Sequence, residues 1–212
     1  MGPIVAGIDV GSPRKGFHAV ALKGRAFLGR FHSAHADHVA AWCRELGVHV
    51  VAIDAPCKWS RTGRARQAER DLMNEKIWCF ATPTRNAALA HKAAQYNWML
   101  AGEALYLALA SSHRLFDGVE HGNGRPIVFE TFPHAIACHL KGQILRAKDK
   151  RRDRLQLLSR EGVDTKEMTN IDWIDAGLCA LAAAFWAAGE EQRYGDPHEG
   201  FIIVPPWRRN SG

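Results

Sequence analysis

Acidic residues interrupt or end three apolar segments of this sequence. Asp9 lies inside the first segment, Asp54 directly follows the second, and Glu130 directly follows the third. An ionised carboxylate in an apolar core is unfavourable unless it has a cation, hydrogen-bond donors or access to solvent. Carboxylates in such positions therefore indicate a functional site, and binding of a metal ion is the chemistry that fits them.

Two further carboxylates, Asp172 and Asp175, are three residues apart, so both project from one face of a helix. Four carboxylates in one place repel one another unless a divalent cation neutralises them, and hard oxygen ligands select Mg²⁺ or Mn²⁺. Two such ions about 4 Å apart can activate water and stabilise the leaving oxygen of a phosphodiester. We expect Asp9, Asp54, Asp172 and Asp175 to be metal ligands, and Glu130 to be an outer ligand or a water-orienting base.

Each acid also has a structural interpretation. Asp9 could begin a turn at a strand end, and Asp54 before Ala55-Pro56 could do the same. Asp172 could form a capping box with Thr169 at the start of a helix. The role of Glu130 is equally open. Together, however, these residues lie at predicted element ends, and this joint placement favours a functional site.

Basic residues suggest the substrate. The net charge of +6 favours acidic partners, of which nucleic acid is the commonest. A phosphate backbone needs cations along its path, and two basic clusters could provide them, although each could also be a solvated helix face. We expect DNA or RNA as partner, and the residues expected to bind it are Arg61, Arg64, Arg66, Arg70, Lys148 and Arg151.

The order of predicted elements places these residues. Three strands open the chain, and then come a helix, a buried strand and further helices and strands, which is the pattern of the ribonuclease H fold, an α/β fold with a mixed central sheet flanked by helices. In that fold the ends of the first and fourth strands lie side by side and face the start of the last helix. The predicted strands are 4–11, 16–22, 25–31, 49–53, 126–129 and 200–204; the predicted helices are 37–46, 67–73, 86–111, 133–140, 155–159 and a last one opening at 169–175.

Short motifs along nearly the whole chain resemble, in order, those of the domain-of-unknown-function family numbered 429, described as a predicted nuclease of ribonuclease H fold. The resemblance implies that fold and an acidic centre at Asp9, Asp54, Glu130, Asp172 and Asp175, with Arg66 and Glu69 nearby. The Asp172-x-x-Asp175 pair is also similar to that of RuvC-type junction resolvases, which have Glu where this chain has Asp54. The motifs are Gly7-Ile8-Asp9 with Lys15-Gly16-Phe17, Ala52-Ile53-Asp54-Ala55-Pro56, Arg66-Gln67-Ala68-Glu69-Arg70, Glu130-Thr131-Phe132-Pro133, Asp172-Trp173-Ile174-Asp175-Ala176 and Gly200-Phe201-Ile202-Ile203-Val204-Pro205.

Two other functions stay open. The run Gly7 to Ser12 resembles the first phosphate loop of actin-like and sugar-kinase ATPases, but those proteins close two domains around a nucleotide, and the chain has the length of one. The third alternative is a non-catalytic nucleic-acid-binding module of the same fold. The leading prediction is a nuclease that depends on Mg²⁺ or Mn²⁺.

Length and composition set the remaining expectations. The 212 residues suggest one domain, 1–212, with a basic insertion at about 57–85. No apolar run reaches the roughly 18 residues that span a bilayer, and the N-terminus does not resemble a signal peptide. Five scattered cysteines suggest no disulfide framework. We expect a cytoplasmic protein without membrane contact, and a homodimer stays an open alternative.

Overall fold

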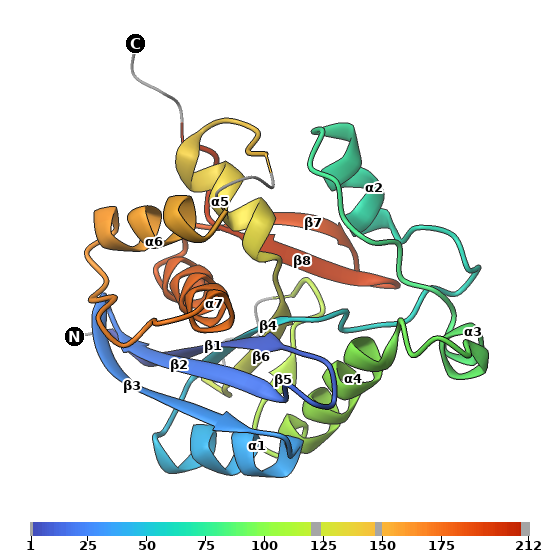
Figure 1. Ribbon diagram of the computed structural model, residues 1–212, viewed down its shortest axis with the longest axis horizontal. Helices are drawn as coiled ribbons and strands as arrows, with labels where there is room; N and C mark the ends of the chain where they lie inside the picture. Colours follow the sequence, from blue (N-terminus) through green and yellow to red (C-terminus); the bar gives the residue numbers. More distant parts are fainter. Residues whose placement is uncertain (1, 120–123, 147–149, 209–212) are drawn as a thin grey trace.

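The computed structural model describes residues 2–119, 124–146 and 150–208 (Figure 1). A mixed sheet lies at its centre between two layers of helices. The strand order is β3-β2-β1-β4-β6-β8-β7, and the short β5 also pairs with β6. The strands are β1 (Ile4–Val10), β2 (Phe17–Lys23), β3 (Ala26–Ser33), β4 (Val50–Asp54), β5 (Arg114–Leu115), β6 (Ile127–Glu130), β7 (Gln192–Asp196) and β8 (Gly200–Val204).

The first three strands form an antiparallel meander, whereas β4 runs parallel to β1, and β6 runs parallel to β4. The connection from β3 to β4 contains α1 (Ala36–Glu45), as a parallel crossover requires. Three antiparallel strands, then a helix, then strands parallel to the first are the topology of the ribonuclease H fold. The predicted fold class is therefore confirmed.

Helices cover both faces of the sheet (Figure 1). On one face α7 packs against β1, β2 and β4, with α5 and α6 beside it; on the other, α1 and α4 pack together. α2 packs against β7. The bounds of these helices are α2 (Gln67–Asn74), α3 (Arg85–Ala90), α4 (Asn97–Leu109), α5 (Pro133–Lys141), α6 (Lys150–Arg160) and α7 (Ile171–Ala187).

Side chains of the central strands alternate between these two layers, because successive residues of a strand point to opposite faces. Val5 and Ala52 belong to the core under α7, whereas Ile8 and Ile53 belong to the core against α1 and α4. The alternation places Asp9 and Asp54, at the strand ends, on the α7 side.

Gly7 brings α7 into backbone contact with β1. A Cβ atom at this position would overlap backbone atoms of Ala176, Cys179 and Ala180. Only glycine permits this approach. Since Asp9 is two residues along the same face, the close packing at Gly7 holds the first turns of α7 near Asp9.

Parts of the predicted element pattern differ from the structure. The expected helix 86–111 is two helices, because the chain leaves the helical path after Ala90 and Ala94 adopts a left-handed conformation with φ of 53°. Helix α6 begins at Lys150, five residues before the predicted start, and β5 and β7 were not predicted. None of the described helices combines the length and apolarity needed to cross a membrane.

Candidate acidic site

Asp9 and Asp54 lie beside each other at the ends of β1 and β4. The two residues are in register on adjacent parallel strands, which are about 4.8 Å apart, so both side chains point to the same face. Asp9 is 9% exposed, and Asp54 is half-buried. The predicted meeting of these two acids is thus found in the structure.

Helix α7 contributes Asp172 in its first turn and Asp175 one turn further on. Asp175 is buried and Asp172 is half-buried. The cap of this helix is Asn170, whose side-chain oxygen accepts a hydrogen bond from the backbone N–H of Trp173 at 2.9 Å. Asp172 is therefore not needed as a cap with Thr169, and the capping-box interpretation was wrong.

The four carboxylates influence one another electrostatically. Burial raises the pKa of Asp9 to about 8, and the negative charges of Asp175 and Asp172 add to this effect. Burial, Asp9 and Asp175 likewise hold the pKa of Asp54 well above its ordinary value. Burial also raises the pKa of Asp175, although Arg154 opposes the shift. The site therefore has more negative charge than its surroundings stabilise.

Two basic residues compensate part of this charge. Lys15, in the β1–β2 turn, donates to both carboxylate oxygens of Asp172 at 3.0 and 3.1 Å. Arg154 of α6 donates to Oδ1 of Asp175 at 2.5 Å. The side chains of Asp9 and Asp54 form no hydrogen bond or ion pair with any described residue. The unpaired carboxylates are thus the two on the sheet.

The donor set fits a divalent metal ion chemically, because it consists of carboxylate oxygens with an excess of negative charge. The side-chain positions are not those of a complete site: within residues 2–119, 124–146 and 150–208, no three His, Cys, Asp or Glu side chains are grouped to hold a metal ion. Because Lys15 and Arg154 occupy Asp172 and Asp175, a metal ion that used all four carboxylates would have to displace both.

Glu130 does not join this cluster. It is in register with Ile53, one residue before Asp54, and so points to the opposite face of the sheet. Nη1 and Nη2 of Arg66 donate to its two oxygens at 2.8 and 2.6 Å, and the N–H of Cys57 donates to Oε2 at 2.8 Å. Its carboxylate is fully engaged, which differs from the expected catalytic role.

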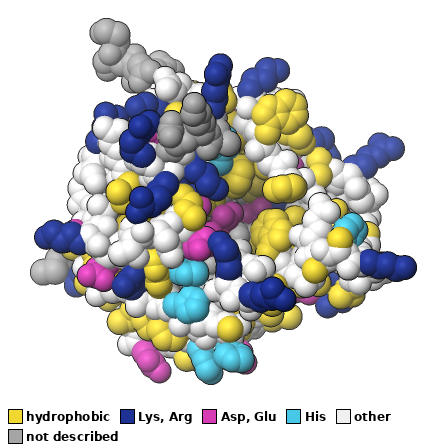
Figure 2. Space-filling view, in the orientation of Figure 1, with side chains coloured by type: hydrophobic (Ala, Val, Ile, Leu, Met, Phe, Trp, Pro, Cys, Tyr) yellow, Lys and Arg dark blue, Asp and Glu magenta, His cyan; other side chains and the backbone are white. Residues whose placement is uncertain are grey.

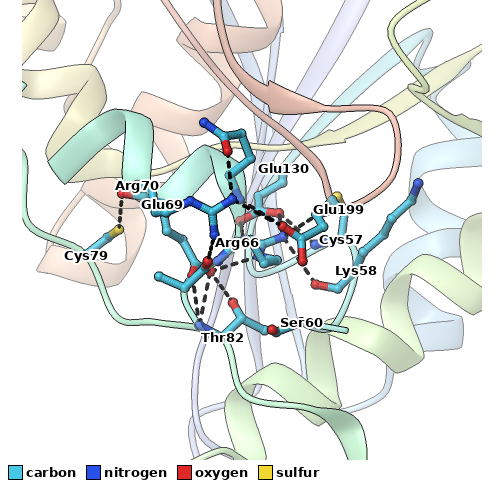
Figure 3. A network of polar contacts seen from close by, with 12 residues as sticks. Cys57, Lys58, Ser60, Arg66, Glu69, Arg70, Cys79, Thr82, Glu130 and Glu199 are labelled. Atoms are coloured by element: carbon cyan, nitrogen blue, oxygen red, sulfur yellow. Dashed lines mark hydrogen bonds and ion pairs between the residues drawn. The ribbon is translucent and has the colours of Figure 1, made fainter. Parts of the chain in front are cut away.

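Arg66, Glu69 and Glu130 form a buried ion network (Figure 3). The Arg66 side chain is 1% exposed, and its Nε donates to Glu69 at 2.8 Å. Glu69 also accepts hydrogen bonds from the backbone and hydroxyl of Thr82. The network ties both ends of the 57–85 segment to β6, so Arg66 anchors this segment and does not face a phosphate backbone.

The other predicted phosphate-binding residues lie in varied surroundings. Arg61 and Arg64 are exposed, and their guanidinium groups have no described partner. Arg70 is exposed and donates to the backbone oxygen of Ala65. Arg151 is exposed and donates to the backbone oxygen of Thr169 at 2.9 Å. Lys148 lies outside the described residues.

A pocket adjoins the acidic site. Asp54 lines it together with members of the ion network and with the aromatic side chains of Phe80, Trp98 and Phe132. Figure 2 shows a hollow on this face, with acidic side chains on its floor, basic side chains around it and hydrophobic side chains along one side. Acidic side chains therefore lie next to aromatic side chains in this pocket.

Sequence reasoning missed three residues of the site. Arg154 was not among the residues expected at the acidic site, because its burial depends on how α6 packs against α7. Lys15 was noted only as part of a motif. His18 is in register with Asp9, is 8% exposed, and its Nδ1 has no hydrogen-bond partner among the described residues. Burial lowers the pKa of His18, which favours the neutral imidazole.

The turn after β1 does not have the form of a phosphate loop. The N–H groups of Gly11, Lys15 and Gly16 donate to carbonyl oxygens within the turn itself, at 2.8 to 2.9 Å. Donors that are already bonded do not form a cradle for a phosphate. This geometry does not favour the actin-like or sugar-kinase alternative.

The profile of the family described as "Protein of unknown function (DUF429)" matches residues 7–199. No curated protein matches the sequence. Among solved structures the chain is similar to RuvC of Thermus thermophilus, with 16% identity and a TM-score of 0.45 over 88% of this chain and 96% of that chain.

Proposed function

This chain belongs to the DUF429 family, and we propose that its acidic site binds a divalent metal ion and hydrolyses phosphodiester bonds of nucleic acid. One observation carries the proposal. Asp9 and Asp54 lie in register on one face of the sheet, Asp9 buried and Asp54 half-buried, and neither forms an ion pair with a described residue, while α7 adds two more carboxylates. Without a cation, the ionised carboxylates of such a site are unfavourable because they are buried and close together. A bound divalent cation would neutralise their charge.

Asp9 and Asp54 would hold the metal ion, and Asp172 and Asp175 would complete its ligands if Lys15 and Arg154 moved away from them. Bound Mg²⁺ or Mn²⁺ would supply a Lewis acid that activates water and neutralises charge on the phosphate. Lys15 and Arg154, once released from their carboxylates, would be available to bind phosphate oxygens. The exposed Arg61 and neighbouring basic residues bind the backbone further away.

The test uses purified protein with Mg²⁺ or Mn²⁺ on DNA, RNA and branched substrates, beside Asp9→Asn and Asp54→Asn variants. We expect metal-dependent cleavage that either substitution reduces by a factor of roughly 100 or more, as is typical when a group that stabilises the transition state is removed. Calorimetry with Mn²⁺ reports binding separately from cleavage. If wild-type protein neither binds Mn²⁺ nor cleaves any substrate, the proposal is wrong.

A non-catalytic nucleic-acid-binding module is the second candidate, and the ion pairs favour it. Lys15 and Arg154 already neutralise two carboxylates, so the fold could be stable without a metal ion. This candidate predicts nucleic-acid binding that weakens steeply with salt and is unchanged by Mn²⁺ or by Asp9→Asn.

A further inference from the structure

The 57–85 segment exposes two aromatic side chains, of which Phe80 lines the pocket next to the acidic site. Exposure alternates along its last part: Ile77 is buried, Trp78 is 70% exposed, Cys79 is partly buried and Phe80 is 74% exposed. Trp78 and Phe80 therefore project from the same side of the chain, about 7 Å apart if the backbone is extended. Large aromatic side chains are seldom left this exposed without a function.

Phe80 is directly connected with the proposed chemistry. It lines the same pocket as Asp54, so a group that packs on its ring lies next to the acidic site. Trp98 and Phe132 line that pocket as well, and both are partly exposed. Aromatic side chains therefore line the pocket beside the carboxylate of Asp54.

The segment is also rigidly held and basic. Ile77 and Thr82, on either side of the aromatic pair, are fully buried, and the Arg66–Glu69–Glu130 network fixes Thr82. The segment 57–85 contains seven basic and three acidic residues. A protein partner that covered Trp78 and Phe80 would also have to match the exposed cations of this segment, such as Arg61 and Arg64, whereas a nucleic-acid strand supplies flat rings and phosphates together.

We propose that the site takes an unpaired strand of DNA or RNA, whose bases stack on Phe80 and Trp78 while its phosphates meet the exposed arginines. This inference rests on the proposed function and narrows its substrate class. Bases in a duplex are already stacked on their neighbours and cannot reach these rings. Aromatic stacking does not depend on base identity, so the expected preference is for an unpaired strand and not for a particular sequence.

The experiment measures binding in the presence of EDTA, so that cleavage does not intervene. Fluorescein-labelled oligothymidylate, oligouridylate and a blunt DNA duplex are titrated with wild-type protein and with Phe80→Ala and Trp78→Ala variants. We expect each substitution to weaken single-strand binding by a factor of roughly 5 to 100, the range for loss of one stacked base, and to leave duplex binding unchanged. The two single-stranded probes separate DNA from RNA.

Matched variants exclude an effect of altered folding. Phe80→Tyr retains the stacking surface and should bind as the wild type does, and Leu28→Ala removes an exposed apolar side chain from the distant strand β3. Quenching of tryptophan fluorescence on single-strand binding that is smaller in Trp78→Ala than in wild type adds direct evidence for stacking on Trp78. If both alanine variants bind the single-stranded probes as tightly as wild type, the inference is overturned while the proposed function stands. If wild-type protein binds no single-stranded probe, the inference is overturned as well, and the Mn²⁺-binding and cleavage assays then decide the proposed function separately.

Discussion

Asp9 of β1 and Asp54 of β4 occupy the same level on neighbouring parallel strands and face the same helix, α7. Neither side chain has a basic partner among the described residues, whereas the two carboxylates of α7 do. The sheet therefore carries acidic groups without a described ion-pair partner, on which Lys15 and Arg154 act only through space. This arrangement determines how the protein should respond to pH, to metal ions and to loss of its basic residues.

The pKa of Asp9 predicts a pH-dependent stability. Its carboxyl has a pKa of about 8 in the folded protein and an ordinary value of 3.8, so the folded state holds the proton more tightly. Stability from this group is present at low pH and is lost as the pH rises from 3.8 towards 8. The Asp9→Asn variant has no ionisable group at this position and so does not lose this stability. Its free energy of unfolding should therefore exceed that of wild type by an amount that grows with pH to a few kcal/mol.

Urea unfolding at a series of pH values, without divalent ions, measures this difference. Because only the difference between the two proteins is used, the titration of other groups largely cancels. Saturating Mn²⁺ should remove much of the difference, since it stabilises the ionised form. Unfolding free energies that run parallel for both proteins across this pH range would show that Asp9 is not strongly perturbed.

Lys15 should compete with a metal ion for Asp172. Its side chain is 57% exposed, so its ion pair contributes less than about 1 kcal/mol to stability, and Lys15→Ala should leave the unfolding free energy nearly unchanged. Removing the competing cation should raise Mn²⁺ affinity several-fold in calorimetric titrations. Lys23→Ala, an exposed lysine at the far end of β2, is the matched control and should have no effect. A lower affinity would mean that Lys15 holds Asp172 in its binding position.

Arg66 should be essential for stability. Replacing it with Met would leave Glu69 and Glu130 buried without their cation, and breaking a buried pair in this way costs about 3 to 5 kcal/mol. Arg64→Ala, two residues earlier and exposed, should change the unfolding free energy by no more than about 0.5 kcal/mol. Urea unfolding measures both. A stable Arg66→Met protein with weakened nucleic-acid binding would restore the phosphate-binding interpretation.

Arg64 and Arg66 show which features of the fold and of the site could be predicted from the sequence and which could not. The strand pattern sufficed to predict that Asp9 and Asp54 lie side by side, and the spacing of Asp172 and Asp175 that both project from α7, because strand order and local periodicity determine these positions. The charge of Arg66 was evident from the sequence, but its burial was not. That burial depends on an ion pair with Glu130, which lies 64 residues further along the chain. The same limitation applied to Arg154, whose partner is on another helix.

Gly7 should determine the spacing between α7 and the acidic strands. Gly7→Ala would push a methyl group into the backbone at Ala176 and Ala180, so α7 must move away. We expect a loss of about 3 kcal/mol or more in the free energy of unfolding. Gly29→Ala, on β3 with open space around its Cα, is the control and should be neutral or slightly stabilising. Because α7 carries two of the four carboxylates, Mn²⁺ affinity should fall in Gly7→Ala but not in Gly29→Ala; equal affinity in both would mean that α7 contributes nothing to the metal site.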